Sequence, residues 1–255
     1  MDWITHTATG YFVGQIITRP EERPRRAGWW WAIAAITPDW LEFATSWFGD
    51  VHRGVTHSLY LWPLLALAWA AAARRWGGEQ VASLKRLWLV FFMILGSHLL
   101  LDVFLAYRLY FAWPFSEARW TWDVMPLFDV YVYAGWLILL LVWWRWRMPS
   151  RTTAKIGLAI LLLVLALRVG GKTRAQLVAL DMQSGIPPTV MVRTLPDYLQ
   201  PWIWYTELPQ TAPYWTAINV VTGQVVPDGQ TLDPCFPPIP YADRWREHAR
   251  RHHER

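Results

Sequence analysis

Long apolar runs fill the middle of the chain, from about residue 55 to residue 169, and the last third is ordinary in polarity. A transmembrane helix needs about 17–25 mostly apolar residues, and the runs 55–73, 87–105 and 130–146 qualify. The run 156–169 is shorter but almost purely aliphatic, and we count it as a fourth span. This pattern predicts a mainly α-helical protein with a polytopic transmembrane domain.

Two shorter apolar pieces, residues 5–18 and 28–36, precede these runs and flank the basic loop 19–26. Each is too short to cross a bilayer alone, so we expect a re-entrant hairpin or two partial spans packed on the others. The 21 tryptophans support a membrane protein, because many of them flank the apolar runs. Tryptophan is enriched where a bilayer meets water, since its ring is apolar and its N–H needs a partner.

Basic residues predict the orientation, because Lys and Arg in short loops favour the cytoplasmic side. They gather in loops 19–26, 74–86 and 145–155, whereas the alternating loops contain only Arg53, Arg108 and Arg119. We therefore expect the N-terminus, the loops 39–54 and 107–128 and the C-terminal third to lie outside. Arg168, Lys172 and Arg174 would then also lie outside, which argues mildly against the fourth span.

The formal net charge of +5 does not indicate a nucleic-acid partner, because the basic residues sit at the ends of apolar runs rather than in one stripe. The single cysteine, Cys235, excludes an intrachain disulfide. The first residues lack the basic region of a cleavable signal peptide, so we expect the N-terminus, with His6, to be retained.

Histidines and aspartates gather on the predicted outer side, and every histidine before the C-terminal tail falls there. The gathered residues are His6, Asp39, His52, His57, His98, Asp102, Asp123 and Asp129. Several His and Asp side chains that converge in one water-accessible pocket suit a divalent cation such as zinc. Manganese or a two-metal site remains an alternative.

His98 and Asp102 stand out, because the spacing i, i+4 puts both on one helix face inside an apolar run. A charged Asp near a bilayer centre costs about 2.5–3.5 kcal/mol, so it should face a protein interior with a partner. The pair could bind one metal ion, or it could be a hydrogen bond that holds helices together. His52 and His57 alone are typical of solvated loop residues, and Asp39 after Pro38 is typical of a cap or turn.

Two sequence strings are specific only in combination: residues 52–58, which read His-Arg-Gly-Val-Thr-His-Ser, and the later His98-x-x-x-Asp102. Together with Thr5-His6, Pro38-Asp39, Trp113-Pro114-Phe115-Ser116 and Asp129, they resemble the YdjM-like family over about residues 1–135. That family comprises LexA-regulated, membrane-bound proteins predicted to be metal-dependent hydrolases. The resemblance implies metal-dependent hydrolysis at the inner membrane, with the ligand set His6, Asp39, His57, His98 and Asp102.

One position departs from the family pattern. Family members usually read Pro-Asp-x-Asp, whereas Trp40 and Leu41 follow Asp39 here and the next acid is Glu42. If the second Asp of the family is a ligand, then Glu42 replaces it or one metal position is impaired.

The C-terminal third predicts a short helix at 173–182 and strands at 189–194, 201–208 and 214–226, the last with a turn at Thr222-Gly223. We therefore expect a membrane domain at 1–170, a small α+β outer domain at 171–241 and a charged tail at 242–255. The outer domain is interpreted as a cap over the site, with a substrate-gating lid as the alternative.

The leading functional hypothesis is hydrolysis of a lipid or lipid-linked phosphoester by a metal-activated water at the outer headgroup region. Asp123, Glu42 or His52 is the candidate general base, and Arg53 or Arg119 could bind a phosphate. One alternative is a metal transporter or sensor, which would need ionisable groups continuing to the cytoplasmic side. The other is a structural membrane protein whose His–Asp pairs only join helices.

Overall fold

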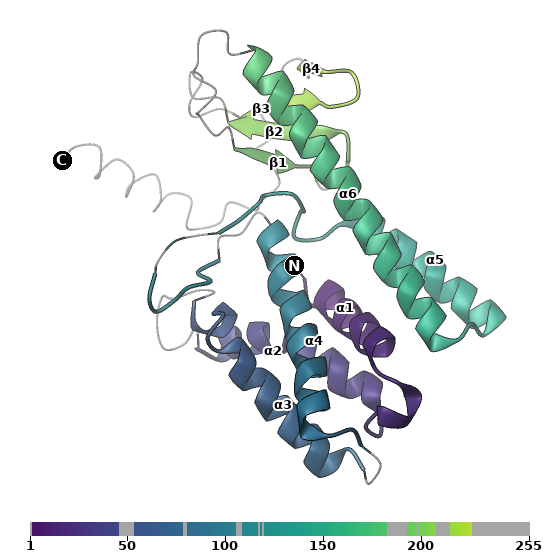
Figure 1. Ribbon diagram of the computed structural model, residues 1–255. Coiled ribbons are helices and arrows are strands. Elements are labelled where there is room, and N and C mark those ends of the chain that lie inside the picture. The colour runs from purple at the N-terminus through teal and green to yellow at the C-terminus, as the bar shows by residue number, and fades with distance from the viewer. Residues whose placement is uncertain are drawn as a thin grey trace. The chain divides into compact units, whose positions relative to one another are not determined.

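The computed structural model describes residues 2–45, 54–78, 81–105, 109–116, 118, 120–182, 193–197, 199–207 and 215–225. Within these ranges the protein is mainly helical, with six α-helices followed by a small antiparallel sheet (Figure 1). The chain divides into two compact units, Met1–Gly170 and Gly171–Arg255. Helix α6 begins in the first unit and ends in the second, and each unit is described by itself below.

Helices α1 (Trp3–Ile17) and α2 (Ala27–Thr45) correspond to the two short apolar pieces, and a 3-10 turn, η1 (Pro20–Glu22), lies between them. Asp2 caps α1, since its carboxylate accepts hydrogen bonds from the Thr5 amide (2.9 Å) and hydroxyl (2.7 Å). The helices pack closely at Gly10, where a Cβ atom would overlap the side chain of Ala35. Gly14, one turn further on, meets the Trp31 ring in the same way, so the two glycines allow this close approach.

Helix α2 is longer than predicted, because it continues through Pro38 to Thr45 instead of ending near Ile36. Asp39 therefore lies inside a helix, which excludes the alternative reading of Asp39 as a cap or turn residue. A proline in a helix interior removes one amide donor, which leaves a carbonyl one turn earlier without its usual partner. Thr37, next to the proline, donates its hydroxyl hydrogen to the Ile33 carbonyl at 2.9 Å.

The predicted span 55–73 is wrong in its extent. It begins with the 3-10 turn η3 (Val55–His57), and helix α3 covers only Trp62–Trp76, with Pro63 in its first turn. Between them, Ser58 donates its hydroxyl hydrogen to the Trp113 carbonyl (2.7 Å), and the Leu59 amide bonds the Phe111 carbonyl (3.0 Å). These non-helical contacts hold the segment after His57 away from helical geometry.

Helix α4 (Leu84–Phe104) matches the predicted span 87–105 and is capped by Ser83. It packs against α1, α2 and α3 around a core rich in small residues on α2 and α3, namely Ala34, Ala35, Ala66, Ala70 and Ala73, which meets Phe91, Ile94 and Leu95 of α4. Small side chains let the helices approach closely, as is common in membrane proteins.

Helices α5 (Val130–Trp146) and α6 (Ser150–Met182) are joined by a short connection. Asp129 caps α5 by accepting from the amides of Tyr131 (2.9 Å) and Val132 (3.2 Å), and it also bonds the Arg168 guanidinium (3.0 Å). Arg168 is thus buried in an ion pair. The separate short helix predicted at 173–182 is wrong, because α6 continues through that stretch without a break.

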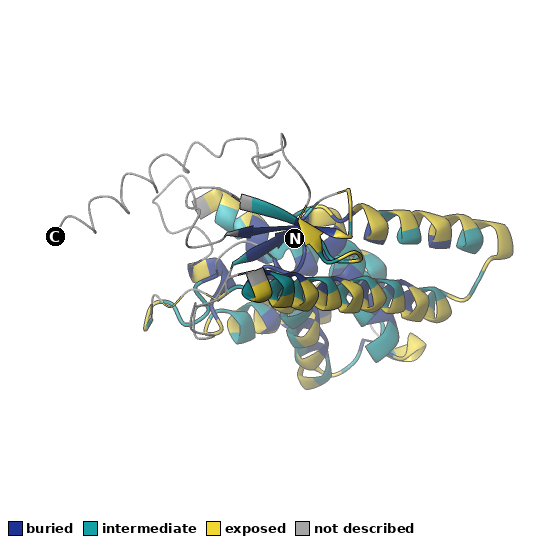
Figure 2. Cartoon of the chain, turned by 90° about the horizontal axis from the view of Figure 1, so that it is seen from above, coloured by how far each residue is buried: buried dark blue, intermediate teal, exposed yellow. Residues whose placement is uncertain are grey.

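Among the described residues, α4 and α6 are long and apolar enough to cross a membrane, and α5 is a shorter apolar helix. Many exposed residues of α5 and α6 are apolar, including Leu137, Ile138, Leu162, Leu163 and Leu167. Figure 2 shows such exposed positions in yellow along the helices. A contiguous exposed apolar surface of this kind marks contact with a membrane or a partner.

In the second unit, strands β1 (Thr194–Pro196), β2 (Ile203–Glu207), β3 (Trp215–Asn219) and β4 (Gln224–Val225) form an antiparallel sheet in sequence order. The predicted turn at Thr222-Gly223 joins β3 to β4, and Gly223 adopts a positive φ of 73° that favours glycine. Ile218 of β3 packs on Ala179 of α6. Most of the first predicted strand, 189–194, and the whole tail lie outside the described residues.

Candidate metal centre

Four buried side chains from three segments converge in the first unit: Asp39 of α2, His57 of η3, and His98 and Asp102 of α4. One ligand atom from each lies within 4.8 Å of all the others. The Nε2 atom of His57 is 3.2 Å from Nε2 of His98 and 3.2 Å from Oδ2 of Asp102. It also lies 3.4 Å from Oδ1 of Asp39, so the four side chains surround one point.

The orientation of His98 is fixed by the backbone of α2. Its Nδ1 lies 2.7 Å from the Ala35 carbonyl, which can only accept, so Nδ1 carries the proton and Nε2 presents a lone pair to the group. Ala35 lies in α2, three residues before Pro38. A metal-binding histidine usually donates its second ring N–H to such a carbonyl.

His57 is held in a comparable way from its Nδ1 side. That nitrogen lies 2.9 Å from the Thr56 hydroxyl and 3.7 Å from Oε2 of Glu42, which is one helical turn after Asp39. Glu42 therefore faces the ring edge of His57 that points away from the group. With a proton on Nδ1, both histidines direct Nε2 lone pairs toward two carboxylates, an arrangement that could bind a cation.

The separations suit a divalent ion. Four ligands placed tetrahedrally about 2.0–2.2 Å from zinc lie about 3.3–3.6 Å from one another. Five of the six separations between the ligand atoms run from 3.2 Å to 3.6 Å, and the sixth, between Asp39 and Asp102, is within 4.8 Å. Within the described residues, Oδ2 of Asp39 is buried without a hydrogen-bond partner, as expected for an oxygen that could bind a cation. The group could therefore hold a metal ion.

Residues 1–175 match the family described as YdjM inner membrane protein. The chain belongs to this family. The match covers every residue of the group, whereas the strands of the sheet lie beyond it. No curated protein and no solved structure was found to match the chain. The resemblance deduced from the sequence strings is thereby confirmed at the level of the family.

His6, which the YdjM resemblance implies as a ligand, lies beside the group of four. Its Nε2 is 3.1 Å from Oδ1 of Asp102, and its ring stacks on His98 with 3.8 Å between centroids. In the described part of the chain, its buried Nδ1 has no hydrogen-bond partner. His6 thus contacts Oδ1 of Asp102, whereas His57 and His98 contact Oδ2. Its role as a metal ligand stays a prediction.

The other predicted residues fall into three classes. Asp123 is buried with a positive φ of 49°, and the amides of its neighbours Trp122 and Val124 bond carbonyls at the end of α4. Its Oδ1 accepts from the Thr121 hydroxyl at 3.1 Å. Asp129 is not part of the group, because it pairs with Arg168. His52, Arg53 and Arg119 lie outside the described residues, so their predicted roles remain predictions.

Several residues that build the site carry no chemical signal of their own in the sequence. The Ala35 carbonyl orients His98, and the Ser58 hydroxyl anchors the turn after His57 to Trp113. This last bond joins two of the strings that the YdjM family shares, Thr56-His57-Ser58 and Trp113-Pro114-Phe115-Ser116. Ser58 was noted in the sequence only as part of a motif, and the structure gives it a positioning role.

Proposed function

We propose that this protein is a membrane-bound, metal-dependent hydrolase that acts on a lipid or phosphoester at the outer face of the inner membrane. The observation that supports this best is the buried group of Asp39, His57, His98 and Asp102, whose ligand atoms all lie within 4.8 Å. We further propose four membrane-crossing helices and a site that faces the periplasm. The distribution of Lys and Arg over the loops supports that orientation.

The four residues of the group would hold the ion, with zinc as the first choice and manganese or a second ion as alternatives. When bound, such an ion acts as a Lewis acid that polarises a phosphoryl or carbonyl oxygen and makes water more nucleophilic at neutral pH. His6 would hold Asp102 in place through its Nε2, at 3.1 Å from Oδ1. The Ala35 carbonyl would keep His98 in the tautomer that binds through Nε2.

The residues proposed for proton transfer and phosphate binding differ in how well their positions fit these roles. Glu42 lies beside Nδ1 of His57, on the far side of the ring from the group, which supports an orienting role more than that of a general base. Asp123 and His52 remain the proposed general bases, and Arg53 and Arg119 the proposed phosphate ligands.

A metal transporter would use the same ligands without chemistry, but it needs a path of polar groups through the bundle. In α4, the stretch from Leu87 to Leu95 is uninterrupted by ionisable residues, and His98 and Asp102 lie near its C-terminal end. The group is therefore one-sided, which favours a hydrolase over a transporter. A structural role of the His–Asp pairs predicts instead that the purified protein holds no metal.

The first experiment measures the metal content of the detergent-purified protein by elemental mass spectrometry. We expect stoichiometric zinc or manganese in the wild type and its loss in His98→Ala and His57→Ala. A matched control, His252→Ala in the tail, should keep the metal. If the wild type stays without metal after reconstitution, the histidines have a structural role, and the proposed hydrolase function loses its mechanism.

The second experiment tests the chemistry itself. The metal-loaded protein is incubated with phospholipids, polyprenyl phosphates and a water-soluble phosphoester, and the release of products is followed. We expect turnover that depends on the metal and disappears in His98→Ala. The absence of turnover in every metal form would refute hydrolysis and leave a metal-binding protein.

A further inference from the structure

Helix α1 has two chemically distinct sides. His6 is buried and contacts the metal group, whereas Ile4, two residues earlier, is 63% exposed. Two residues along a helix turn by about 200°, so these side chains point in opposite directions. Ile4 on this outward side, with Ala8, Tyr11 and the buried Phe12, lines two neighbouring cavities.

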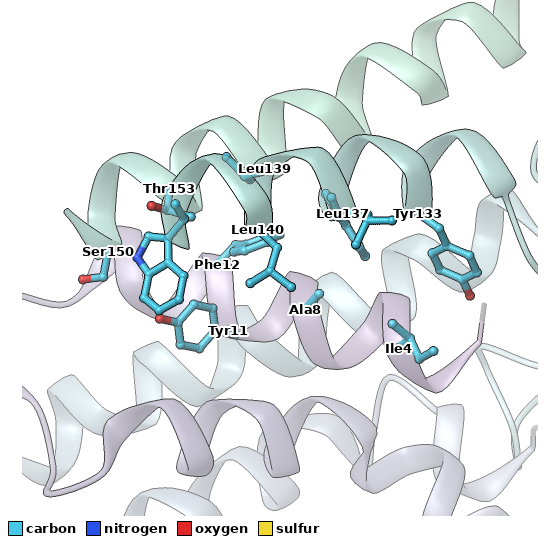
Figure 3. Close-up of a pocket in the computed structure, with 12 residues that line it drawn as sticks. Ile4, Ala8, Tyr11, Phe12, Tyr133, Leu137, Leu139, Leu140, Ser150 and Thr153 are labelled. Carbon is cyan, nitrogen blue, oxygen red and sulfur yellow. The ribbon is translucent and has the colours of Figure 1, made fainter. Parts of the chain in front are cut away.

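The first cavity, which we call the α1–α5 groove, has a volume of about 570 Å³. Figure 3 shows Ile4 and Ala8 of α1 beneath Leu137 and Leu140 of α5, with Ser150 and Thr153 at the far end. Its lining is almost entirely apolar along the two helices. Its volume lies within the range of about 300–1,000 Å³ that is typical of ligand sites.

The second cavity, the α1–α2 groove, has a volume of about 510 Å³ and shares the outward side of α1. Ala32 and Ile36 line it from α2. Asp39 follows Ile36 by three residues and Ala32 by seven, so all three lie on one stripe of the helix. The groove therefore lies on the side of α2 that carries Asp39.

Asp39 is also the point at which the group is least enclosed. Its side chain is 8% exposed, while those of His57, His98 and Asp102 are fully buried. Its Oδ2 atom is buried and has no hydrogen-bond partner among the described residues. A molecule in the α1–α2 groove would thus approach the group from its most accessible ligand.

We propose that the two grooves bind the two hydrocarbon chains of a diacyl phospholipid that straddles α1, with its head group near Asp39. This inference rests on the proposed function, since it names the substrate class of that same site. Apolar linings suit hydrocarbon chains, and the chain belongs to a family of inner membrane proteins, so such lipids surround it. Because the grooves share one side of α1, chains of a single molecule can occupy both.

The test is photocrosslinking of the full-length protein in nanodiscs of phosphatidylethanolamine and phosphatidylglycerol. A trace of diacyl phosphatidylglycerol with a diazirine on its chains is added, and the labelled residues are mapped by mass spectrometry. We expect labels concentrated on both grooves, at α2 near Ile36 and at α5 near Leu140. Ala32→Trp, which fills the α1–α2 groove, should reduce labelling on α2 about tenfold and leave α5 labelled.

Leu163→Trp provides the matched control, because Leu163 is an exposed apolar residue of α6 that lines neither groove. It should leave the labelling of both grooves unchanged. Labels spread evenly over the grooves and the exposed side of α6 would overturn the inference, since the lipid would then be ordinary surrounding bilayer. Labelling of one groove alone would overturn the two-chain arrangement.

Failure of this inference can be told apart from failure of the proposed function, because labelling needs no turnover. Labels spread evenly over the surface of a protein that hydrolyses phosphoesters would refute lipid binding in the grooves and leave the proposed hydrolase function intact. Groove-specific labelling in a protein without turnover would refute the hydrolase, and with it the assignment of the lipid as substrate.

Discussion

The ion pair between Asp129 and Arg168 gives a stability prediction that separates a structural aspartate from those of the metal group. The Arg168 Nε atom donates to Oδ2 of Asp129 at 3.0 Å, and both side chains are almost completely buried. In Arg168→Met the methionine can fill much of the space, but the carboxylate loses its partner. Removing one member of a buried pair costs about 3–5 kcal/mol, since an uncompensated charge remains.

Changing both members should cost less. Asp129→Asn retains an oxygen that can accept from the Tyr131 and Val132 amides, so the cap of α5, worth about 1 kcal/mol, is largely kept. In the double variant no charge remains at the site. We therefore expect the double variant to lose less unfolding free energy than the sum of the two single losses, with a coupling energy of about 2 kcal/mol or more.

The free energy of unfolding is measured by equilibrium titration of detergent-purified protein with sodium dodecyl sulfate, followed by the fluorescence of its 21 tryptophans. Metal content is measured in parallel and should be unchanged in all folded variants, because Asp129 is not part of the metal group. Strictly additive losses would refute the pair. Loss of metal in folded Asp129→Asn would show instead that this residue belongs to the site.

Two further predictions concern the metal site and its scaffold. Glu42→Gln should weaken metal binding about 10–100-fold, because Glu42 lies beside Nδ1 of His57. Metal affinity is measured by competition with a chromophoric chelator. Glu22→Gln, which changes the Glu22–Arg86 ion pair at the surface, is the control. An unchanged metal affinity in Glu42→Gln would contradict the orienting role. Gly10→Val should destabilise the protein by about 1–3 kcal/mol in the same unfolding titration, since its Cβ overlaps Ala35. Gly170→Val, with no atom near the added Cβ, should cost less, and equal losses would argue against close packing of α1 on α2.

The helices whose apolar runs are uniform could be predicted from the sequence. Residues 87–105 predicted α4 almost to its ends, because a long apolar run capped by Ser83 has few alternatives. The run 55–73 misled, since its first residues are held out of the helix by tertiary bonds from Ser58 and Leu59 to residues 111–113. A hydropathy pattern indicates whether a segment favours an apolar environment, but it contains no information on such tertiary hydrogen bonds.

The candidate site was predictable as a set of residue types but not as an arrangement. The spacing of His98 and Asp102 predicted their shared helix face, and the structure brings Asp39 and His57 to the same point. Their orientation depends on the backbone carbonyl of Ala35, which no residue type reveals. His6 likewise could be placed on the right side of the protein, but not on one oxygen of Asp102.

The irregular backbone of the first unit gathers at the metal group for a physical reason. A buried polar site needs hydrogen-bond partners, and most amides and carbonyls inside a regular helix already bond one another. Pro38 lacks an amide hydrogen and interrupts that pattern in α2 next to Asp39, and the turn η3 interrupts it around His57. The carbonyl of Ala35 in α2 orients His98. The helix predictions therefore failed around residue 38 and at 55–61, where the chain supplies residues of the site.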